Sequence, residues 1–270
     1  MISVIVTTKN EENVIEDLFE SLKNQTYKDF EIVLVDNNSS DKTKSIAKEY
    51  NARVFNIGPE RSTQRNYGVN KAIGENVLIL DADMKLTEDV LLELSKVREK
   101  IAIVPEKSFG TGFWTQFKVF EREFYECEDD IEAARYFDKK IFSKYGGYDE
   151  KITGPEDYDL PLRMRKGGEK ISRIKSYILH NEKNFSPYRS AKKKFYYAYK
   201  SANYVKKHPE MVFKQGNMLI RPVFVKKWWK LISHPFLSLG MFHIKLIEMI
   251  GAFLGFIYSV IANPRRSIMS

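Results

Sequence analysis

Short apolar runs alternate with amphipathic segments through the first hundred residues of the chain. Residues Met1 to Thr8 contain ISVIV, a β-branched run typical of a strand buried on both faces. Further strands are expected at Phe30 to Val35, Arg53 to Ile57 and Val77 to Leu80. Helical spacing follows each strand, with apolar positions from Val14 to Leu22, then about 41–50, 62–72 and 88–97, the last with Thr87 as N-cap. This order predicts an α/β fold with a mainly parallel sheet and helices on both faces.

Polar clusters follow three of these strands. They read TTKNEE after the first strand, DNNSSD after the second and DAD after the fourth. Ligands of parallel α/β sheets bind outside the carboxyl ends of the strands. The three clusters therefore predict a binding site at that edge.

The DAD cluster carries Asp81 and Asp83, two residues apart. In an extended conformation both side chains point to the same side. Two carboxylates with open positions beside them suit Mg²⁺ or Mn²⁺ shared with phosphate oxygens. The alternative is a polar strand end that leads into a helix cap.

Other polar residues each allow a structural and a functional interpretation. Asp36 suits an Asx turn or contact with a nucleobase NH. Arg61 and Arg65 lie one helical turn apart, where two guanidinium groups could bind phosphate. The pair Glu156-Asp157 can cap a helix or supply a general base.

Charge is distributed unevenly in this chain of 270 residues and net charge +8. Residues 186–234 hold 12 Lys and Arg against one acid, whereas residues 1–185 carry a net charge of −5. The single cysteine, Cys127, excludes an internal disulfide and a cysteine-based zinc site. The N-terminus does not read as a signal peptide, so a cytoplasmic location is expected.

Basic and aromatic residues are interleaved in 186–234, as in KKKFYYAYK and VKKWWK. Such a segment suits nucleic acid or an anionic membrane surface. Residues 236–262 follow as an apolar stretch interrupted by His243, Lys245 and Glu248. The mixed pattern favours a shallowly inserted helix over a full span. A core helix or a dimer interface would show the same pattern.

Four blocks together resemble the family 2 glycosyltransferases, which have the GT-A fold. They are SVIVTTKNEE, EIVLVDNNSSDKT, RNYGVNKAIGENVLILDADM and GGYDEKITGPEDYDLPLRMRKGG, in the family's order. The resemblance covers most of residues 1–180. It implies a catalytic domain at 1–185, with a Rossmann-like nucleotide-sugar-binding half at 1–105 and an acceptor half at 106–185. Residues 186–270 then form a basic and apolar helical extension that binds the membrane surface through 186–262.

The resemblance also implies roles for single residues on the donor side. A UDP- or GDP-sugar would bind there, with residues of the three polar clusters contacting it. Asp36 would read the base and Arg65 would lie near the ribose or phosphates. The remaining predicted donor contacts are Thr7, Lys9, Glu11, Asp81 and Ala82.

On the reacting side the resemblance implies a divalent cation, Mg²⁺ or Mn²⁺, held by Asp83 and Asp81. A histidine about twenty residues beyond the acidic pair often approaches the metal, and His180 occupies that position. Asp157 would be the catalytic base, and Glu156 would help to bind the acceptor.

The expected reaction is transfer of one sugar, with inversion, to a hydroxyl of a lipid-linked saccharide. The family's Pro-Thr-Tyr after the first strand is replaced here by Thr7-Thr8-Lys9, and the Gln-x-x-Arg-Trp segment of processive synthases is missing. The alternatives are a polyprenyl-phosphate (dolichyl-phosphate) glycosyltransferase and a non-catalytic protein that binds nucleotide or nucleic acid. If the chain transfers a sugar to a lipid-linked saccharide, no nucleic-acid partner is expected. The enzyme would then be peripheral or shallowly inserted on the inner face of the cell membrane.

Overall fold

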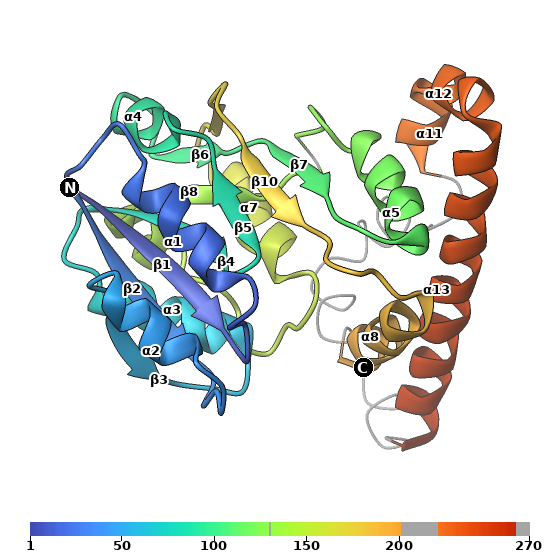
Figure 1. Ribbon diagram of the computed structural model, residues 1–270, viewed down its shortest axis with the longest axis horizontal. Helices are drawn as coiled ribbons and strands as arrows, with labels where there is room; N and C mark the ends of the chain where they lie inside the picture. The colour runs from blue at the N-terminus through green and yellow to red at the C-terminus, as the bar shows by residue number, and fades with distance from the viewer. Residues whose placement is uncertain (130, 201–220, 263–270) are drawn as a thin grey trace. The chain divides into compact units, whose positions relative to one another are not determined.

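The structure is a computed structural model that describes residues 1–129, 131–200 and 221–262 (Figure 1). Its contacts divide the chain into two compact units, each built from several segments. Unit 1 comprises Met1–Lys107, Glu126–Glu150 and Glu156–Asn181, and unit 2 comprises Ser108–Tyr125, Lys151–Pro155 and Glu182–Ser270. Segments of the two units alternate along the chain, so this division does not test the domain boundaries expected at residues 105 and 185. Those boundaries remain predictions.

A seven-stranded sheet forms the centre of unit 1, in the order β3-β2-β1-β4-β8-β6-β9. β1 pairs in parallel with β2 and β4, and β2 pairs in parallel with β3. β8 is antiparallel to both β4 and β6. The strands are β1 (Ile2–Thr8), β2 (Phe30–Asp36), β3 (Arg53–Asn56), β4 (Asn76–Asp81), β6 (Ile101–Ile103), β8 (Ala134–Asp138) and β9 (Ser172–Arg173).

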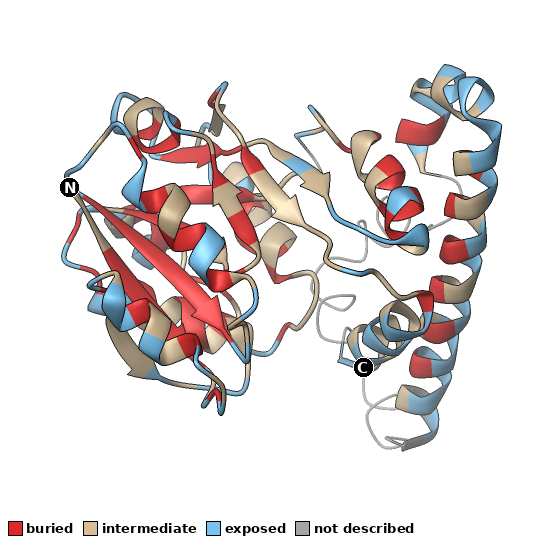
Figure 2. Ribbon diagram, in the orientation of Figure 1, coloured by how far each residue is buried: buried red, intermediate tan, exposed pale blue. Residues whose placement is uncertain are grey.

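Helices cover both faces of this sheet because each buried strand sends alternate side chains to opposite sides. On one face Val4 and Val6 of β1 pack with helices α1 (Ile15–Lys23), α2 (Thr43–Glu49) and α4 (Val90–Ser95). On the other face Ile5 packs in a cluster with residues of α3 (Arg61–Lys71), α6 (Lys139–Lys144) and α7 (Glu156–Lys166). The β1, β2 and β4 strands are buried along most of their length (Figure 2). The predicted layers of a mainly parallel sheet between helices are confirmed.

A small sheet, in the order β5-β10-β7, adjoins the DAD cluster. Its strands are β5 (Met84–Leu86), β7 (Glu106–Phe109) and β10 (Ile178–Asn181). In the β10–β5 register His180 lies opposite Met84, which brings this histidine beside Asp83. The predicted N-cap at Thr87 is wrong: its hydroxyl bonds to the Tyr177 backbone instead, and α4 begins only at Val90.

Unit 2 is helical in the part that the structure describes. Its helices are α5 (Phe113–Glu123), α8 (Pro187–Lys200), α11 (Pro222–Lys226), α12 (Trp228–Ser233) and α13 (Pro235–Ala262). The sequence also predicts a helix at Lys118 to Glu128, and the helix found there, α5, begins and ends five residues earlier. Within α13, Pro235–Ser259 is long and apolar enough to cross a membrane by length and composition. Residues 201–220 and 263–270 of the predicted extension lie outside the described residues.

Candidate functional site

The carboxyl ends of β1, β2 and β4 meet at one edge of the central sheet. In the strand register Thr8 lies beside Asp36, and Thr7 lies beside Asp81. The Thr7 hydroxyl donates a hydrogen bond to Asp81 Oδ1 over 3.4 Å. All three polar clusters thus supply neighbouring side chains, as the parallel strand order requires.

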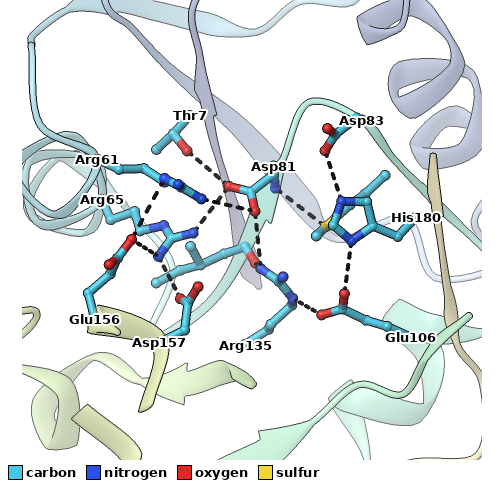
Figure 3. A network of polar contacts seen from close by, with 12 residues as sticks. Thr7, Arg61, Arg65, Asp81, Asp83, Glu106, Arg135, Glu156, Asp157 and His180 are labelled. Atoms are coloured by element: carbon cyan, nitrogen blue, oxygen red, sulfur yellow. Dashed lines mark hydrogen bonds and ion pairs between the residues drawn. The ribbon is translucent and has the colours of Figure 1, made fainter. Parts of the chain in front are cut away.

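Asp81 faces three arginines (Figure 3). Its carboxylate lies 3.1 Å from Arg65, 3.9 Å from Arg61 and 3.8 Å from Arg135. Burial favours the neutral acid, but the three guanidinium groups outweigh it and hold the pKa of Asp81 well below its usual range. Asp81 is therefore an anion that the protein itself already surrounds with positive charge.

Arg65 links Asp81 of the DAD cluster to Asp157 of the acidic pair, which follows Arg65 by 92 residues in the chain. One terminal nitrogen lies 2.6 Å from Asp157 Oδ1 and the other lies 3.1 Å from Asp81 Oδ1. The guanidinium also lies over the Tyr148 ring, 5.2 Å from its centroid. The Arg65 side chain has 0% exposure, so this geometry favours an arginine that positions two carboxylates. Its predicted contact with the ribose or phosphates remains a prediction.

The acidic pair opens helix α7, and its two members differ in exposure. The Glu156 side chain is 2% exposed and lies 3.7 Å from Arg61, whereas Asp157 is 21% exposed. Burial and the neighbouring Asp157 raise the pKa of Glu156 despite the two nearby arginines. Only Asp157 combines an accessible carboxylate with a fixed position, and it is the better candidate for a base.

His180 lies between two carboxylates in the second part of the network. Its Nε2 is 3.5 Å from Asp83 Oδ1 and its Nδ1 is 3.1 Å from Glu106 Oε2. Glu106 also bonds to Arg135 Nε at 2.6 Å. Burial opposes ionisation of Glu106, yet Arg135 and His180 keep its pKa well below the usual value. Glu106 is thus an anionic hydrogen-bond acceptor that orients the imidazole ring.

The two aspartates of the DAD cluster do not point to the same side, and that prediction is wrong. β4 ends at Asp81 and the chain turns at Ala82 and Asp83 before β5 begins. The carboxylates consequently diverge, one toward the arginines and the other toward His180 (Figure 3).

This divergence decides how a divalent cation would fit. Among the described residues no group of three or more His, Cys, Asp and Glu side chains could hold a metal ion. Asp83 and His180 form a pair, however, and Mg²⁺ or Mn²⁺ commonly takes one or two protein ligands and completes its shell with water and phosphate. With its proton on Nδ1 toward Glu106, the imidazole turns the Nε2 lone pair to Asp83, an arrangement that a cation would stabilise. A divalent cation therefore fits this site with Asp83 and His180 as its two protein ligands. The Asp81 carboxylate is already paired with arginines.

The remaining predicted donor contacts lie in different environments. Asp36 is fully buried and accepts bonds from the Thr8 hydroxyl at 2.9 Å and from the Ser39 backbone at 2.6 Å. It therefore closes the turn after β2, and none of its surface is exposed. Lys9 is exposed, and the Glu11 backbone bonds to the Thr43 hydroxyl. The hydrogen bonds of Asp36 go to Thr8 and Ser39, which belong to the first two polar clusters.

The sequence patterns do not predict two residues of the network, Glu106 and Arg135. Arg135 lies on β8, in an ARYFD strand whose pairing with β4 cannot be read from composition. Glu106 lies on β7, just before the Gly- and Phe-rich stretch. Arg135 is buried between Ala134 and Tyr136, and a buried arginine within a strand requires a carboxylate partner, but the sequence alone does not show that burial.

Comparison with known proteins gives this arrangement a context. The family described as Glycosyl transferase family 2 matches residues 3–145. An uncharacterized glycosyltransferase of Methanocaldococcus jannaschii is 31% identical over 205 residues, covering 66% of this chain and 69% of its own length. The GalNAc(5)-diNAcBac-PP-undecaprenol beta-1,3-glucosyltransferase of Campylobacter jejuni is 36% identical over 57% of each chain. The beta-monoglucosyldiacylglycerol synthase of Trichormus variabilis is 32% identical over 60% of this chain. The match spans only 41% of that synthase's length.

Solved structures share the fold at low sequence identity. The mannosyltransferase PcManGT from Pyrobaculum calidifontis, in complex with GDP-Man and Mn²⁺, has a TM-score of 0.62 at 16% identity. That alignment covers 96% of this chain and 86% of the other. Staphylococcus aureus TarS 1-349 in complex with UDP-GlcNAc has a TM-score of 0.55 at 18% identity, covering 97% and 92% of the two chains. These likenesses confirm the GT-A fold, and the match over more than half of its length shows that the chain belongs to glycosyltransferase family 2.

Proposed function

We propose that this glycosyltransferase moves one sugar from a nucleotide-diphosphate sugar to a hydroxyl of a lipid-linked glycan, with inversion at the anomeric carbon. The observation that carries the proposal is the bridge by Arg65 between Asp81 and Asp157. It brings the carboxylate at the end of β4 and the acidic pair of α7 into one site. The proposed donor side and the proposed base are thereby held at a fixed separation.

The proposed residue roles follow from exposure and charge. Asp157 accepts the proton of the acceptor hydroxyl as that oxygen attacks, since its carboxylate is accessible and its position is fixed by Arg65. Arg61, with 34% of its side chain exposed, is the arginine of the pair that can reach the diphosphate. Asp83 and His180 would hold the divalent cation, which supplies Lewis-acid stabilisation of the diphosphate leaving group. The site holds three arginines, Arg61, Arg65 and Arg135, beside more carboxyl groups, namely Asp81, Asp83, Glu106, Glu156 and Asp157, and this excess of acid also favours a bound cation.

Similar proteins support the donor and acceptor classes. PcManGT was solved with GDP-Man and Mn²⁺, and TarS with UDP-GlcNAc. The names of the Campylobacter and Trichormus relatives point to an undecaprenol-linked saccharide and to a diacylglycerol glycolipid. A lipid-linked acceptor for this chain implies a location at the inner face of the cell membrane.

Transfer assays with the full chain test the proposal. Labelled UDP- and GDP-sugars are incubated with Mn²⁺ and a bacterial or archaeal lipid extract, and the lipid products are analysed by mass spectrometry. D157N is expected to lose at least about a hundredfold in transfer rate, since general base catalysis contributes 10²–10⁴-fold. D17N is the matched control, because Asp17 is half exposed in a surface pair with Lys85.

The outcome separates the proposal from its rivals. A sugar joined to a saccharide hydroxyl, lost in D157N and kept in D17N, supports it. A sugar attached to a single phosphate would favour the polyprenyl-phosphate reaction instead. Full activity of D157N would refute the assignment of the base.

A further inference from the structure

We propose that the outer face of α13, together with α12, is a membrane-binding surface that lies in the plane of an anionic bilayer rather than across it. This inference gives a surface and an orientation to the membrane association in the proposed function. Its test does not depend on sugar transfer.

The charged residues of α13 are buried on its inner face. Lys245 and Glu248 are each 1% exposed. Lys245 Nζ lies 2.8 Å from Glu121 of α5, and Glu248 lies 3.5 Å from Lys118 of the same helix. Both lysines and both glutamates thus neutralise one another inside unit 2. The charges that interrupt the apolar sequence do not reach the outer surface.

Small residues hold the inner face against its neighbours. A Cβ atom on Gly251 would overlap the Ala191 carbonyl oxygen of α8, and one on Gly255 would overlap the Phe195 carbonyl oxygen. A Cβ on Gly240 would overlap the Phe117 ring of α5. The inner face of α13 is therefore packed against α5 and α8 along its length, and these helices cannot be separated from it without loss of close contact.

The outer face of α13 is exposed over the same length (Figure 2), and the large side chains exposed there are apolar. His243 is its one exposed polar side chain among the described residues, and it stacks on Trp114. α11 and α12 add exposed Val225, Trp228, Trp229 and Ile232. The exposed apolar residues of α13 are Phe236, Leu239, Leu246, Ile250, Phe253, Leu254, Phe256, Ile257, Tyr258 and Ile261.

A second copy of this chain or a lipid bilayer could cover such a face, and the width of the face favours the bilayer. Exposed Leu239, Leu246, Ile250, Phe253 and Ile257 follow the three-and-four spacing of a coiled-coil seam. A coiled coil between two copies in water would carry charged residues beside that seam. Here the flanking positions are also apolar, with Leu254, Phe256 and Ile261 exposed. A broad apolar face without flanking charges suits lipid.

Charge and aromatic content agree with an anionic bilayer surface. Within the described residues 221–262 the one acid is the buried Glu248, so the charges that reach the surface are positive. Lys226 is exposed and Lys227 is half-buried, directly before the exposed Trp228 and Trp229. Tryptophan is enriched at membrane interfaces and lysine is attracted to anionic headgroups.

The packing of α13 also determines its orientation. A helix of 28 residues is about 42 Å long, which exceeds a hydrocarbon core of about 30 Å. If α13 crossed the bilayer, the helices packed on its inner face would enter too. α8 would then carry exposed Arg189, Lys192, Lys193 and Lys200 into hydrocarbon, where charged side chains are costly. With α13 in the plane of the interface, its apolar face enters the acyl boundary and those charges stay in water.

Vesicle flotation of the full chain tests the binding surface. Vesicles of phosphatidylcholine with and without phosphatidylglycerol are used, together with the variants I250E and I261E. We expect flotation that requires phosphatidylglycerol, weakens with salt and falls at least about tenfold in each variant. The matched control is I73E, which makes the same change at an isoleucine of unit 1 that is 68% exposed. It should float like the unsubstituted chain.

Orientation is tested by tryptophan depth. The chain's three tryptophans are replaced by Phe, and one tryptophan is then introduced at Leu239, Ile250 or Ile261. Quenching by brominated lipids should give the same shallow depth at all three positions. A deep position at 250 with shallow positions at 239 and 261 would indicate a span and overturn the in-plane orientation.

Two further results would overturn the surface assignment. One is absence of flotation. The other is a lipid-free dimer, detected by light scattering, that I250E dissociates and I73E does not. Stabilisation by donor nucleotide with Mn²⁺ is measured on the same variants and should be unchanged in I250E. If donor nucleotide with Mn²⁺ does not stabilise the unsubstituted chain, that result would contradict the proposed function and leave the vesicle result standing.

Discussion

Replacing Arg65 with lysine tests whether the two halves of the site are held by one guanidinium group. Arg65 uses separate nitrogens for Asp157 at 2.6 Å and for Asp81 at 3.1 Å. A lysine keeps the positive charge, but its single ammonium cannot hold both carboxylates in that fork geometry. R65K therefore removes about one charge-assisted hydrogen bond, a loss of about 1.5–3 kcal/mol.

The same free energy predicts two separate effects. If it fixes Asp157 for proton transfer, kcat falls about ten- to a hundredfold, since 1.36 kcal/mol corresponds to a factor of ten. The melting temperature falls by about 3–12 °C, at 2–4 °C per kcal/mol for a domain of this size. The KM for the donor stays within about twofold of its original value, because buried Arg65 has no exposed surface for the donor.

Steady-state transfer with donor titration, and calorimetry of the same preparations, measure these effects. R53K is the matched control, because Arg53 forms a 2.7 Å pair with Glu31 but is 40% exposed. It should change neither kcat nor the donor KM. An unchanged kcat in R65K would refute the positioning role. A raised donor KM with unchanged kcat would instead support the direct donor contact that the sequence predicts.

Three further substitutions probe the other buried contacts. E106Q should weaken Mn²⁺ binding about 10–100-fold, because the acceptor that orients His180 loses its charge. The measurement is the Mn²⁺ dependence of the stabilisation by donor nucleotide. An unchanged Mn²⁺ affinity would contradict this role of Glu106. Burial disfavours the Glu121 anion, but Lys118 and Lys245 keep its pKa well below the usual 4.5, so its stabilisation is present above about pH 4.5 and lost as pH falls further. E121Q should lose about 3–5 kcal/mol near neutral pH and show a shallower loss of stability in acid urea titrations; an equally steep acid loss would count against the pairing. G251A should lower the melting temperature, although Gly to Ala inside a helix normally stabilises by about 1 kcal/mol, because the added Cβ meets the Ala191 carbonyl; a higher melting temperature would contradict the close packing.

Much of the fold can be predicted from sequence because buried parallel strands have a distinct composition. ISVIV and NVLIL are continuous apolar runs between turn residues, and both form strands of the central sheet. The later strands of the central sheet, β6, β8 and β9, are not predicted from the sequence. β8 reads ARYFD and β6 is three residues long, so neither shows a strand periodicity. Their place in the sheet is set by pairing with residues far away in the chain.

The sequence predicts which acidic clusters form the candidate site, but it does not predict how their side chains are arranged. The acidic groups at residues 81–83 and 156–157 were identified, and the structure brings Asp81 and Asp157 onto one arginine. The divergence of Asp81 and Asp83 depends on a turn that their spacing cannot reveal. Glu106 and Arg135 are not predicted because neither lies near a recognisable motif, and each joins the candidate site through a partner on another strand.

The ion pairs between α5 and α13 bear on how this protein can be handled in solution. A chain shortened before Pro235, to remove its most apolar helix, would also remove the α13 partners of Lys118 and Glu121 and leave these two residues of α5 paired with each other. It would uncover the Phe117 ring that Gly240 covers. Shortening should therefore yield an aggregating protein in place of a soluble enzyme. Polar substitutions on the exposed side of α13 would leave those pairs intact, and they offer the route to a detergent-free preparation.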